Sequence, residues 1–513
     1  MTQAHELRDT GLALGSGEQA LSTWRISLPL IVGIYVYLLT LYQGSVLNLL
    51  LLDGDTYWHV AAGRWILAHQ AIPSADPFSH TMPGVPWVAH EWLSEVLLAL
   101  AHEFAGWTGV VALTGLAFAT TAALLTRALL AHLVPARALL LAVAAVMMVV
   151  PHLLARPHIL SMPLLMLWTI GLVRAADAGR APSLWLLPVM AVWANAHGGF
   201  TLGLALTLAF ALEAALDGWR RGEMTRALKS WGLFFGLAVC ASVLTPQGPN
   251  GLVFTWHVMV ESQYALSRIG EWASPDFHRF QPLAVWLLGG LAVVLHQGLR
   301  LPPVRLLLVL GLIYLSLKHM RNIELLGLLA PLFVAAPLAT QWRQAAQLAR
   351  PDGIARRLGA LAPRAGAAAA AFACLMVVPA TLLQARLRPV ELPLQAVPVR
   401  ALEAALRAGA QGPVLNAYNW GGYLIYSDIA VFIDGRAEMY GDAFFKKYID
   451  AMSLTQPASF EPLLAKYRIT WTLLSPDTPA VALLDRNPNW KRVHADDTAV
   501  VHMRRSHTPE GTP

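Results

Sequence analysis

The chain has 513 residues, of which 56% are hydrophobic and only 13% are charged. A soluble domain usually carries about 25% charged residues, and a soluble core stops growing near about 300 residues. The composition therefore excludes a soluble globular protein, and it excludes a disordered one because disordered chains are poor in apolar residues. The net charge of +6 falls mainly in loops between apolar runs, which is typical of a membrane protein and not of a nucleic-acid-binding protein.

Residues 1–24 are polar and lack the basic start and cleavage site of a secretory signal peptide, so we expect a cytoplasmic tail. Residues 25–385 predict the transmembrane domain of a polytopic α-helical membrane protein. A crossing needs about 20 apolar residues, and this region holds about eleven suitable runs. The runs are 27–50, 110–133, 138–153, 159–173, 184–194, 202–216, 231–244, 282–295, 305–317, 323–338 and 367–383.

The first outer loop, 53–109, contains an ambiguous segment at 90–104, HEWLSEVLLALAHEF. It is apolar enough to suggest a crossing, yet it carries five ionisable residues. If it lies on the membrane surface, the later basic loops fall on the same side as the N-terminus. If it crosses, every later loop inverts and the positive-inside rule fails repeatedly. We therefore predict an interfacial amphipathic helix.

Beyond residue 385 the composition becomes that of an ordinary soluble domain. Residues 386–513 predict a small extracytoplasmic α/β domain, because an odd number of crossings separates it from the tail. The expected helices are 399–408, 443–452 and 460–466, and the expected strands are 430–433, 470–474 and 498–503.

Two aspartates directly after the first run are the leading catalytic candidates. Asp53 and Asp55 stand where apolar walls would raise a carboxylate's pKa towards that of a general base. His59 lies one helical turn beyond Asp55, and Glu91 begins the surface helix as a candidate second acid. The structural alternative is that Asp55 caps a helix over 57–67 and that Glu91 favours its helix N-terminus.

Cations at the outer ends of helices break the prevailing charge rule and suit an anionic partner such as a phosphate. Lipid-headgroup contact or an internal salt bridge is the alternative. His197 precedes two glycines that permit close approach of a ligand, although a simple helical hairpin explains them nearly as well. The candidate binding residues of the helical region are Arg156, His158, His197, His319 and Arg321.

The outer domain adds NAYNWGGYLIY and FIDGRAEMY. Trp420 and Tyr423 are candidates to stack on sugar rings or to seat the domain on the membrane. Asp434 and Arg436 are further binding candidates, and their alternative is a pair across a turn.

A divalent metal, Mg²⁺ or Mn²⁺, is a further hypothesis, since carboxylates and imidazoles gather in the first outer loop. No spacing there is a standard zinc motif. The residues considered are Asp55, His59, His80, His90 and Glu91.

The order of these features resembles the GT-C superfamily of polyprenyl-phosphate-sugar-dependent glycosyltransferases. The shared features are one crossing, an acidic residue opening a long outer loop with prolines (Pro73, Pro77 and Pro86), a surface helix, and an outer α/β domain. The segment NWGGYLIY stands where the oligosaccharyltransferase branch carries Trp-Trp-Asp-Tyr-Gly, but it lacks the aspartate, so acceptor-peptide recognition is not carried over. The DTYWH, HEWL, HGGF and FIDGR segments resemble those of an uncharacterised bacterial branch.

The resemblance implies transfer of a sugar from a polyprenyl-phosphate-sugar donor to a glycan, lipid or protein acceptor, at the outer face of a bacterial inner membrane. Asp55 or Asp53 would take the acceptor's proton. Arg156 and Arg321, helped by His158 or His319, would stabilise the leaving phosphate.

Three other functions stay open. A transporter or flippase of lipid-linked or anionic substrates would explain outward arginines, but the polar groups gather near one face and no inverted repeat is visible. A polymerase or ligase of lipid-linked oligosaccharides would use a similar outer cleft. A non-enzymatic assembly factor would use the outer domain as its binding module. Turnover of the donor lipid separates the enzymes from the other classes.

Overall fold

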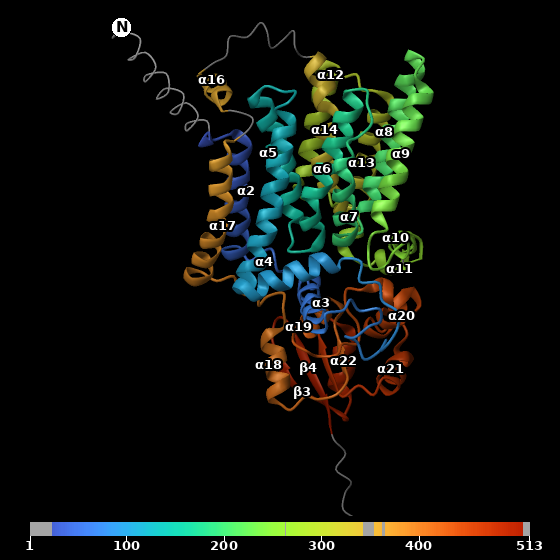
Figure 1. Ribbon diagram of the computed structural model, residues 1–513. Helices are drawn as coiled ribbons and strands as arrows, with labels where there is room; N and C mark the ends of the chain where they lie inside the picture. Colours follow the sequence, from blue (N-terminus) through green and yellow to red (C-terminus); the bar gives the residue numbers. More distant parts are fainter. Residues whose placement is uncertain (1–22, 262, 342–352, 362–364, 506–513) are drawn as a thin grey trace, which may run out of the picture.

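The computed structural model describes residues 23–261, 263–341, 353–361 and 365–505. The tail expected at 1–24 thus lies almost entirely outside the described residues. Within them, a bundle of long helices forms one end of the molecule and a small α/β domain forms the other (Figure 1). A helix occupies each of the eleven apolar runs. These are α2 (Leu28–Ser45), the second part of α4 (Trp92–Leu129), α5 (Pro135–Val149), α6 (Pro157–Asp177), α7 (Leu187–Ala196), α8 (Phe200–Arg221), α9 (Met224–Ser242), α12 (Pro282–Gln297), α13 (Pro303–Lys318), α14 (Ile323–Gln341) and α17 (Ala367–Leu387).

Seven helices of the described chain are long and apolar enough to cross a membrane. This supports a polytopic helical membrane protein, whereas the figure of eleven crossings stays a prediction. The seven are Leu28–Ser45, Trp92–Leu129, Pro135–His152, Pro157–Asp177, Phe200–Arg221, Met320–Gln341 and Ala367–Leu387.

Helix α4 holds both the ambiguous segment and the crossing that follows it. Its backbone leaves the helical conformation at Ala105 and Gly106, and Gly106 has a φ of 57°. Glycine reaches this left-handed region without the steric cost that a side chain brings, so the helix turns sharply here. Figure 1 shows the first part of α4 lying across the end of the bundle that faces the α/β domain, as expected of an interfacial helix.

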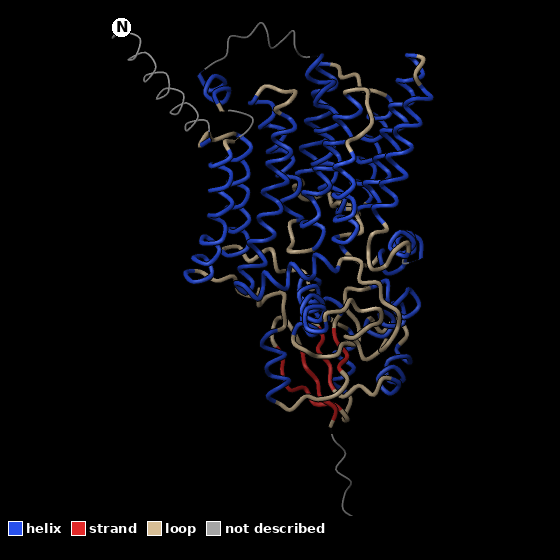
Figure 2. Tube along the Cα trace, viewed as in Figure 1, coloured by secondary structure: helices blue, strands red, loops and turns tan. Residues whose placement is uncertain are grey.

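The α/β domain is built on a four-stranded sheet of order β1-β2-β4-β3 (Figure 2). Strands β1 and β2 are parallel, and the other two pairings are antiparallel. The elements are α18 (Val399–Arg407), β1 (Val414–Asn416), α19 (Gly421–Tyr426), α20 (Ala437–Met452), α21 (Phe460–Lys466), β2 (Trp471–Leu474), α22 (Pro479–Arg486), β3 (Trp490–Ala495) and β4 (Val500–Arg504).

The strand expected at 430–433 is wrong. This extended segment lies outside the sheet and pairs instead with the first outer loop, through a single bridge between Ser79 and Val431. The amide N–H of Val431 donates to the carbonyl of Phe78, and the N–H of His80 donates to the carbonyl of Val431. The segment therefore joins the α/β domain to the outer loop.

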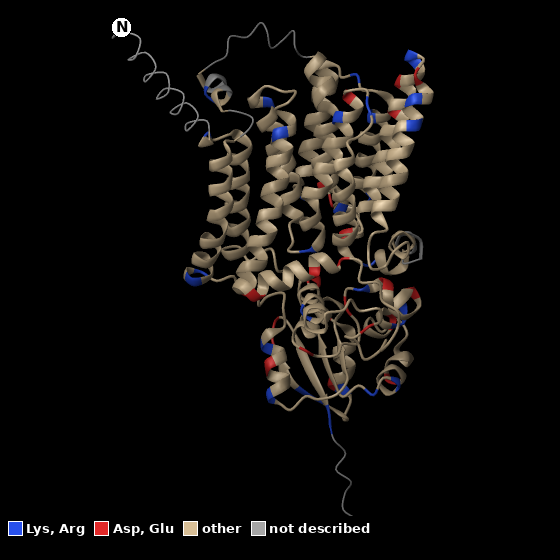
Figure 3. Cartoon of the chain, in the orientation of Figure 1, with Lys and Arg blue, Asp and Glu red and all other residues tan. Residues whose placement is uncertain are grey.

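Basic residues gather at the end of the bundle away from the α/β domain (Figure 3). The positive-inside rule predicts that this end faces the cytoplasm and that the α/β domain lies outside. The orientation in the membrane stays a prediction. Helix α3 (Asp55–His69) lies between the bundle and the α/β domain, in contact with both α4 and α19.

Candidate functional site

The candidate site lies where the bundle meets the α/β domain. Asp55 is the first residue of α3, and Arg156 stands immediately before α6. Two short 3-10 turns, η3 (Gly270–Trp272) and η4 (Met320–Asn322), bring in Glu271 and Arg321. These segments are far apart in sequence, so the site exists only in the folded chain.

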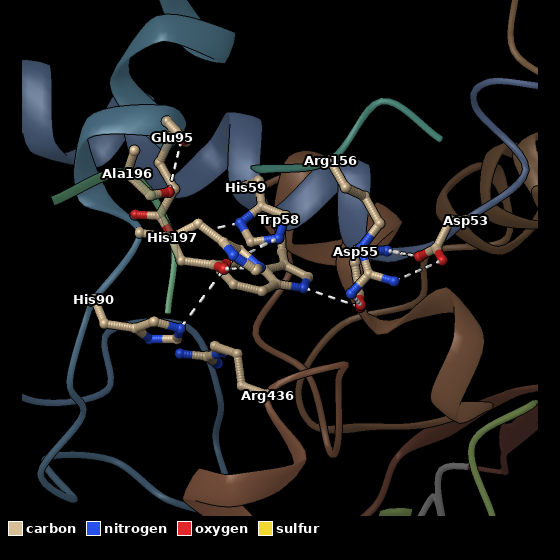
Figure 4. Close-up of polar contacts among 12 residues, drawn as sticks. Asp53, Asp55, Trp58, His59, His90, Glu95, Arg156, Ala196, His197 and Arg436 are labelled. Atoms are coloured by element: carbon tan, nitrogen blue, oxygen red, sulfur yellow. Dashed lines mark hydrogen bonds and ion pairs between the residues drawn. The ribbon is translucent and has the colours of Figure 1, made fainter. Parts of the chain in front are cut away.

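Arg156 is the centre of this group (Figure 4). Its Nη1 lies 3.1 Å from Oδ2 of Asp53 and 3.0 Å from Oε2 of Glu271, and its Nη2 lies 2.7 Å from Oδ2 of Asp55. Arg321 joins from the other side, with Nη1 at 3.3 Å from Oε1 of Glu271. We call these five residues the carboxylate–arginine cluster.

Hydrogen bonds at the start of α3 fix the orientation of the two aspartate side chains. Oδ1 of Asp53 accepts the backbone N–H of Asp55 at 2.7 Å, which satisfies one of the free donors at the start of α3. The indole N–H of Trp58 donates to Oδ1 of Asp55 at 3.1 Å. Asp53 is thus occupied as a capping residue, while Asp55 faces the centre of the cluster.

Glycines of the α/β domain allow it to rest directly on this turn. A Cβ at Gly435 would overlap Oδ1 of Asp55 and lie 3.1 Å from the indole nitrogen of Trp58. A Cβ at Gly54 would overlap the carbonyl oxygen of Asn419, and one at Gly422 would overlap that of Gly54. Gly54, Gly422 and Gly435 do not have a positive φ. Close approach, rather than backbone conformation, is therefore what requires glycine here.

Burial shapes the electrostatics of the cluster. Burial raises the pKa of Asp55 to about 7, although the guanidinium of Arg156 opposes the rise. Burial also acts to raise the pKa of Glu271, but the two arginines outweigh it and hold that pKa below its usual range. A carboxyl that titrates near neutrality, beside a Glu271 that stays ionised, is the arrangement that separates a base from a purely electrostatic group.

A second group, the histidine–glutamate cluster, lies beside the first. His59 is only 1% exposed, with Nε2 at 3.7 Å from Glu91 and Nδ1 at 3.4 Å from Glu95. His197 and His90 approach Glu91 to 3.3 and 3.6 Å. Burial raises the pKa of Glu91 to about 7 and lowers that of His59 well below its usual range. Near neutral pH the burial therefore favours a neutral His59, while Glu91 is the group that titrates.

Two predicted cations stand at the edge of the site. Nδ1 of His319 lies 2.6 Å from the carbonyl oxygen of Trp272, and the guanidinium of Arg321 lies 4.5 Å over the Trp272 ring. The side chain of Arg321 is 33% exposed. His158 lies deeper, with Nε2 at 3.8 Å from Glu324 and its ring 6.4 Å from that of His197.

The predicted residues of the α/β domain are interior. Arg436 is 1% exposed and forms ion pairs of 2.7 Å with both Asp434 and Asp76. The indole of Trp420 donates to the carbonyl of Ala396, and Tyr423 packs edge-on against Tyr57 of α3. These side chains hold the domain on the outer loop, and they do not line the carboxylate–arginine cluster.

The residues considered for a divalent metal are not brought together as one site. Nε2 of His80 lies 2.9 Å from the carbonyl oxygen of Val414 in the α/β domain, apart from the histidine–glutamate cluster. In the part of the chain that the structure describes, no group of three or more His, Cys, Asp or Glu side chains is arranged to hold a metal ion.

Glu271 is a member of the cluster to which sequence reasoning assigned no role, beyond its place among the polar residues of the outer turns. Its signal was weak, because a carboxylate in a polar turn between apolar runs is usually a solvated surface group. A cavity of about 620 Å³ was likewise not foreseen, and it opens beside the histidine–glutamate cluster where α4 begins and α7 and α9 end. Its lining is largely apolar and includes Trp92, Val192, Asn195 and Leu244.

No family model matches the chain, and no curated protein matches it. Its fold, however, is similar to that of solved structures. The archaeal oligosaccharyltransferase AglB from Archaeoglobus fulgidus, in complex with an inhibitory peptide and a dolichol-phosphate, is 10% identical with a TM-score of 0.55, over 87% of this chain and 69% of AglB. The apo oligosaccharyltransferase of that organism is 11% identical with a TM-score of 0.51, over 87% of this chain and 69% of the other.

ArnT from Cupriavidus metallidurans in the apo state is 14% identical with a TM-score of 0.47, over 92% of this chain and 97% of ArnT. The likeness to AglB confirms the expected GT-C-type fold. At such identities the likeness is one of fold, and the chemistry rests on the residues of the site.

Proposed function

We propose that this protein is a membrane glycosyltransferase that moves a sugar from a polyprenyl-phosphate-linked donor to a hydroxyl of an acceptor. The observation that carries the proposal is Asp55. It is a carboxyl whose pKa burial raises to about 7, and it stands among arginines at one end of a GT-C-type bundle. A base of this kind is matched to proton transfer at neutral pH.

The reaction is an inverting displacement. Asp55 accepts the proton of the acceptor hydroxyl, the hydroxyl oxygen bonds to the anomeric carbon, and the bond from that carbon to the phosphate oxygen breaks on the opposite face. The polyprenyl phosphate leaves with the electron pair. Asp55 is the base rather than Asp53, because Asp53 caps α3 through Oδ1 and pairs with Arg156 through Oδ2.

Arg321 binds the leaving phosphate. Its side chain is a third exposed, and Glu271 is its carboxylate partner at 3.3 Å, whereas Arg156 is shared by three carboxylates at 2.7 to 3.1 Å. His319, whose Nδ1 lies 2.6 Å from the carbonyl oxygen of Trp272, adds a second group at the same edge. Stabilisation of developing phosphate charge is usually among the largest catalytic contributions.

The apolar cavity beside Trp92 and Leu244 suits the isoprenoid chain of the donor, since it opens among exposed apolar side chains at the end of the bundle. In the histidine–glutamate cluster, Glu91 takes up protons released near the site, because burial raises its pKa to about 7, and His59 is its neutral partner. The expected setting is the outer face of a bacterial inner membrane, with the basic end of the bundle in the cytoplasm. Trp420, Tyr423, Asp434 and Arg436 are left out of the substrate site because they are buried in the domain contact.

The test is a deletion strain complemented with the wild type, Asp55→Asn or Asp53→Asn, followed by mass spectrometry of lipid-linked sugars and surface glycans. We expect only the wild type and, in part, Asp53→Asn to restore the missing sugar, with donor lipid accumulating in Asp55→Asn. Asp428→Asn is the matched control, because Asp428 is exposed and its φ of 60° suits asparagine. Full restoration by Asp55→Asn would remove its role as base. Substrate movement without new glycosidic bonds would indicate a flippase instead.

A further inference from the structure

The three carboxylates of the carboxylate–arginine cluster are the oxygen donors that a hard divalent ion prefers, although in the described chain they are not arranged as a metal site. Asp53 and Asp55 come from the outer loop and Glu271 from η3, and all three approach one point. Hard divalent cations such as Mg²⁺ and Mn²⁺ are bound by carboxylate oxygens converging in this way. The point of convergence in this chain, however, is the guanidinium of Arg156.

Every oxygen of these carboxylates already faces a nitrogen of the protein. In Asp53, Oδ1 accepts the N–H of Asp55 and Oδ2 pairs with Arg156, at 2.7 and 3.1 Å. In Asp55, Oδ1 accepts the indole N–H of Trp58 and Oδ2 pairs with Arg156, at 3.1 and 2.7 Å.

In Glu271, Oε2 pairs with Arg156 and Oε1 with Arg321, at 3.0 and 3.3 Å. An ion bound by these oxygens would have to displace the guanidinium of Arg156 or lie within a few ångström of its positive charge. Because the cluster is largely shielded from water, such like-charge proximity is costly. The donor set is therefore satisfied by the chain itself and does not fit an additional divalent ion.

We propose that Arg156 is a resident cation, which holds Asp53, Asp55 and Glu271 together in the place that a divalent metal ion would otherwise take. The positive charge at this point is then part of the fold and does not depend on the metal concentration around the protein. Arg156 acts through the carboxylates, so it is a positioning residue. That transfer needs no divalent ion follows only if the proposed glycosyltransferase function holds.

The first experiment measures metal binding and needs no activity. Full-length protein in detergent is stripped with EDTA, and bound Mn²⁺ is counted by electron paramagnetic resonance for the wild type, Arg156→Ala and Arg156→Lys. We expect no Mn²⁺ at this cluster in the wild type or in Arg156→Lys, and one Mn²⁺ per chain in Arg156→Ala. In the double variant Arg156→Ala with Glu271→Gln, that ion should be bound at least tenfold more weakly.

Three results would overturn the inference. The first is Mn²⁺ bound by the wild type and lost in Asp53→Asn, and the second is a folded Arg156→Ala that binds no Mn²⁺. If Arg156→Ala does not fold, the wild-type measurement still decides. The third is wild-type transfer of sugar that EDTA abolishes and Mn²⁺ restores. Absence of any sugar transfer would reject the proposed function but leave the metal-binding result standing, so the two failures are distinguishable.

Discussion

Replacement of Gly435 by alanine tests whether the α/β domain sets the position of the Asp55 carboxylate, the proposed base. The new Cβ would overlap Oδ1 of Asp55 and lie 2.7 Å from its Cγ, whereas ordinary contacts of this kind begin at 3.4 Å. The turn that carries Gly435 yields little, because Arg436 is fixed by ion pairs of 2.7 Å on two sides. Most of the displacement therefore falls on Asp55, and it exceeds about 1 Å.

A displacement of about 1 Å at a reacting group costs on the order of 100-fold in rate. We expect Gly435→Ala to lower kcat by about that factor, while KM for the donor lipid changes little because Arg321 lies on η4, away from the turn. Overpacking of this kind costs about 1–3 kcal/mol of stability, so the variant stays folded.

The assay is steady-state transfer with purified donor lipid, together with thermal unfolding in detergent. Gly232→Ala is the matched control, because Gly232 lies within α9 and a Cβ there meets nothing within 4 Å. Wild-type kcat in a folded Gly435→Ala would refute the reasoning. It would mean that the carboxylate of Asp55 tolerates displacement and is not the base.

Three further outcomes are expected. Trp58→Phe removes a hydrogen bond that lowers the pKa of Asp55. The acid limb of the kcat/KM profile, expected near pH 7, should therefore move to higher pH by up to about one unit, and a pH profile that does not move would contradict this. Arg321→Ala lowers kcat by about 100- to 1,000-fold and Arg321→Lys recovers part of it, as measured by single turnover; equal rates in both variants exclude a charge effect. Asp76→Ala leaves the buried Arg436 with one of its two carboxylates, so we expect it to lower the free energy of unfolding by about 3–5 kcal/mol, visible as a lower unfolding midpoint. An unchanged midpoint would show that Asp434 alone is enough to pair with Arg436.

The helical part of the fold could be predicted because its signal is local. Each apolar run is a continuous stretch of sequence, and one helix formed on each. A helix covers the ambiguous segment 90–104, and its interfacial position stays a prediction from the distribution of charge. The sharp turn at Gly106 follows from a residue that tolerates positive φ. The strand expected at 430–433 was wrong because its partner, Ser79, lies some 350 residues earlier in the chain, and no local pattern reports such a pairing.

The site could be predicted only in part, for the same reason. Asp55 was selected because it directly follows the first apolar run, and Arg156 because it is a cation at the outer end of a helix, against the prevailing charge rule. Glu271 obeys every local rule, and its role comes from the arginines that other segments bring to it. Trp420 is an aromatic residue of the type that stacks on sugar rings, but in the fold its side chain is buried and its indole N–H donates to the carbonyl of Ala396. The sequence alone does not show whether an aromatic side chain is buried or exposed.

The bridge between Asp76 and Arg436 spans 360 positions of the chain, and this separation bears on biogenesis. The outer loop with Asp53 and Asp55 is synthesised early, long before the turn at Gly435 that rests on it. The helices can form in order along the chain, but the loop lacks this partner until the C-terminal segment has been translated. A chain that ends before Arg436 would leave Asp76 without this ion pair, so the contact between the loop and the α/β domain forms only after synthesis of the C-terminal segment.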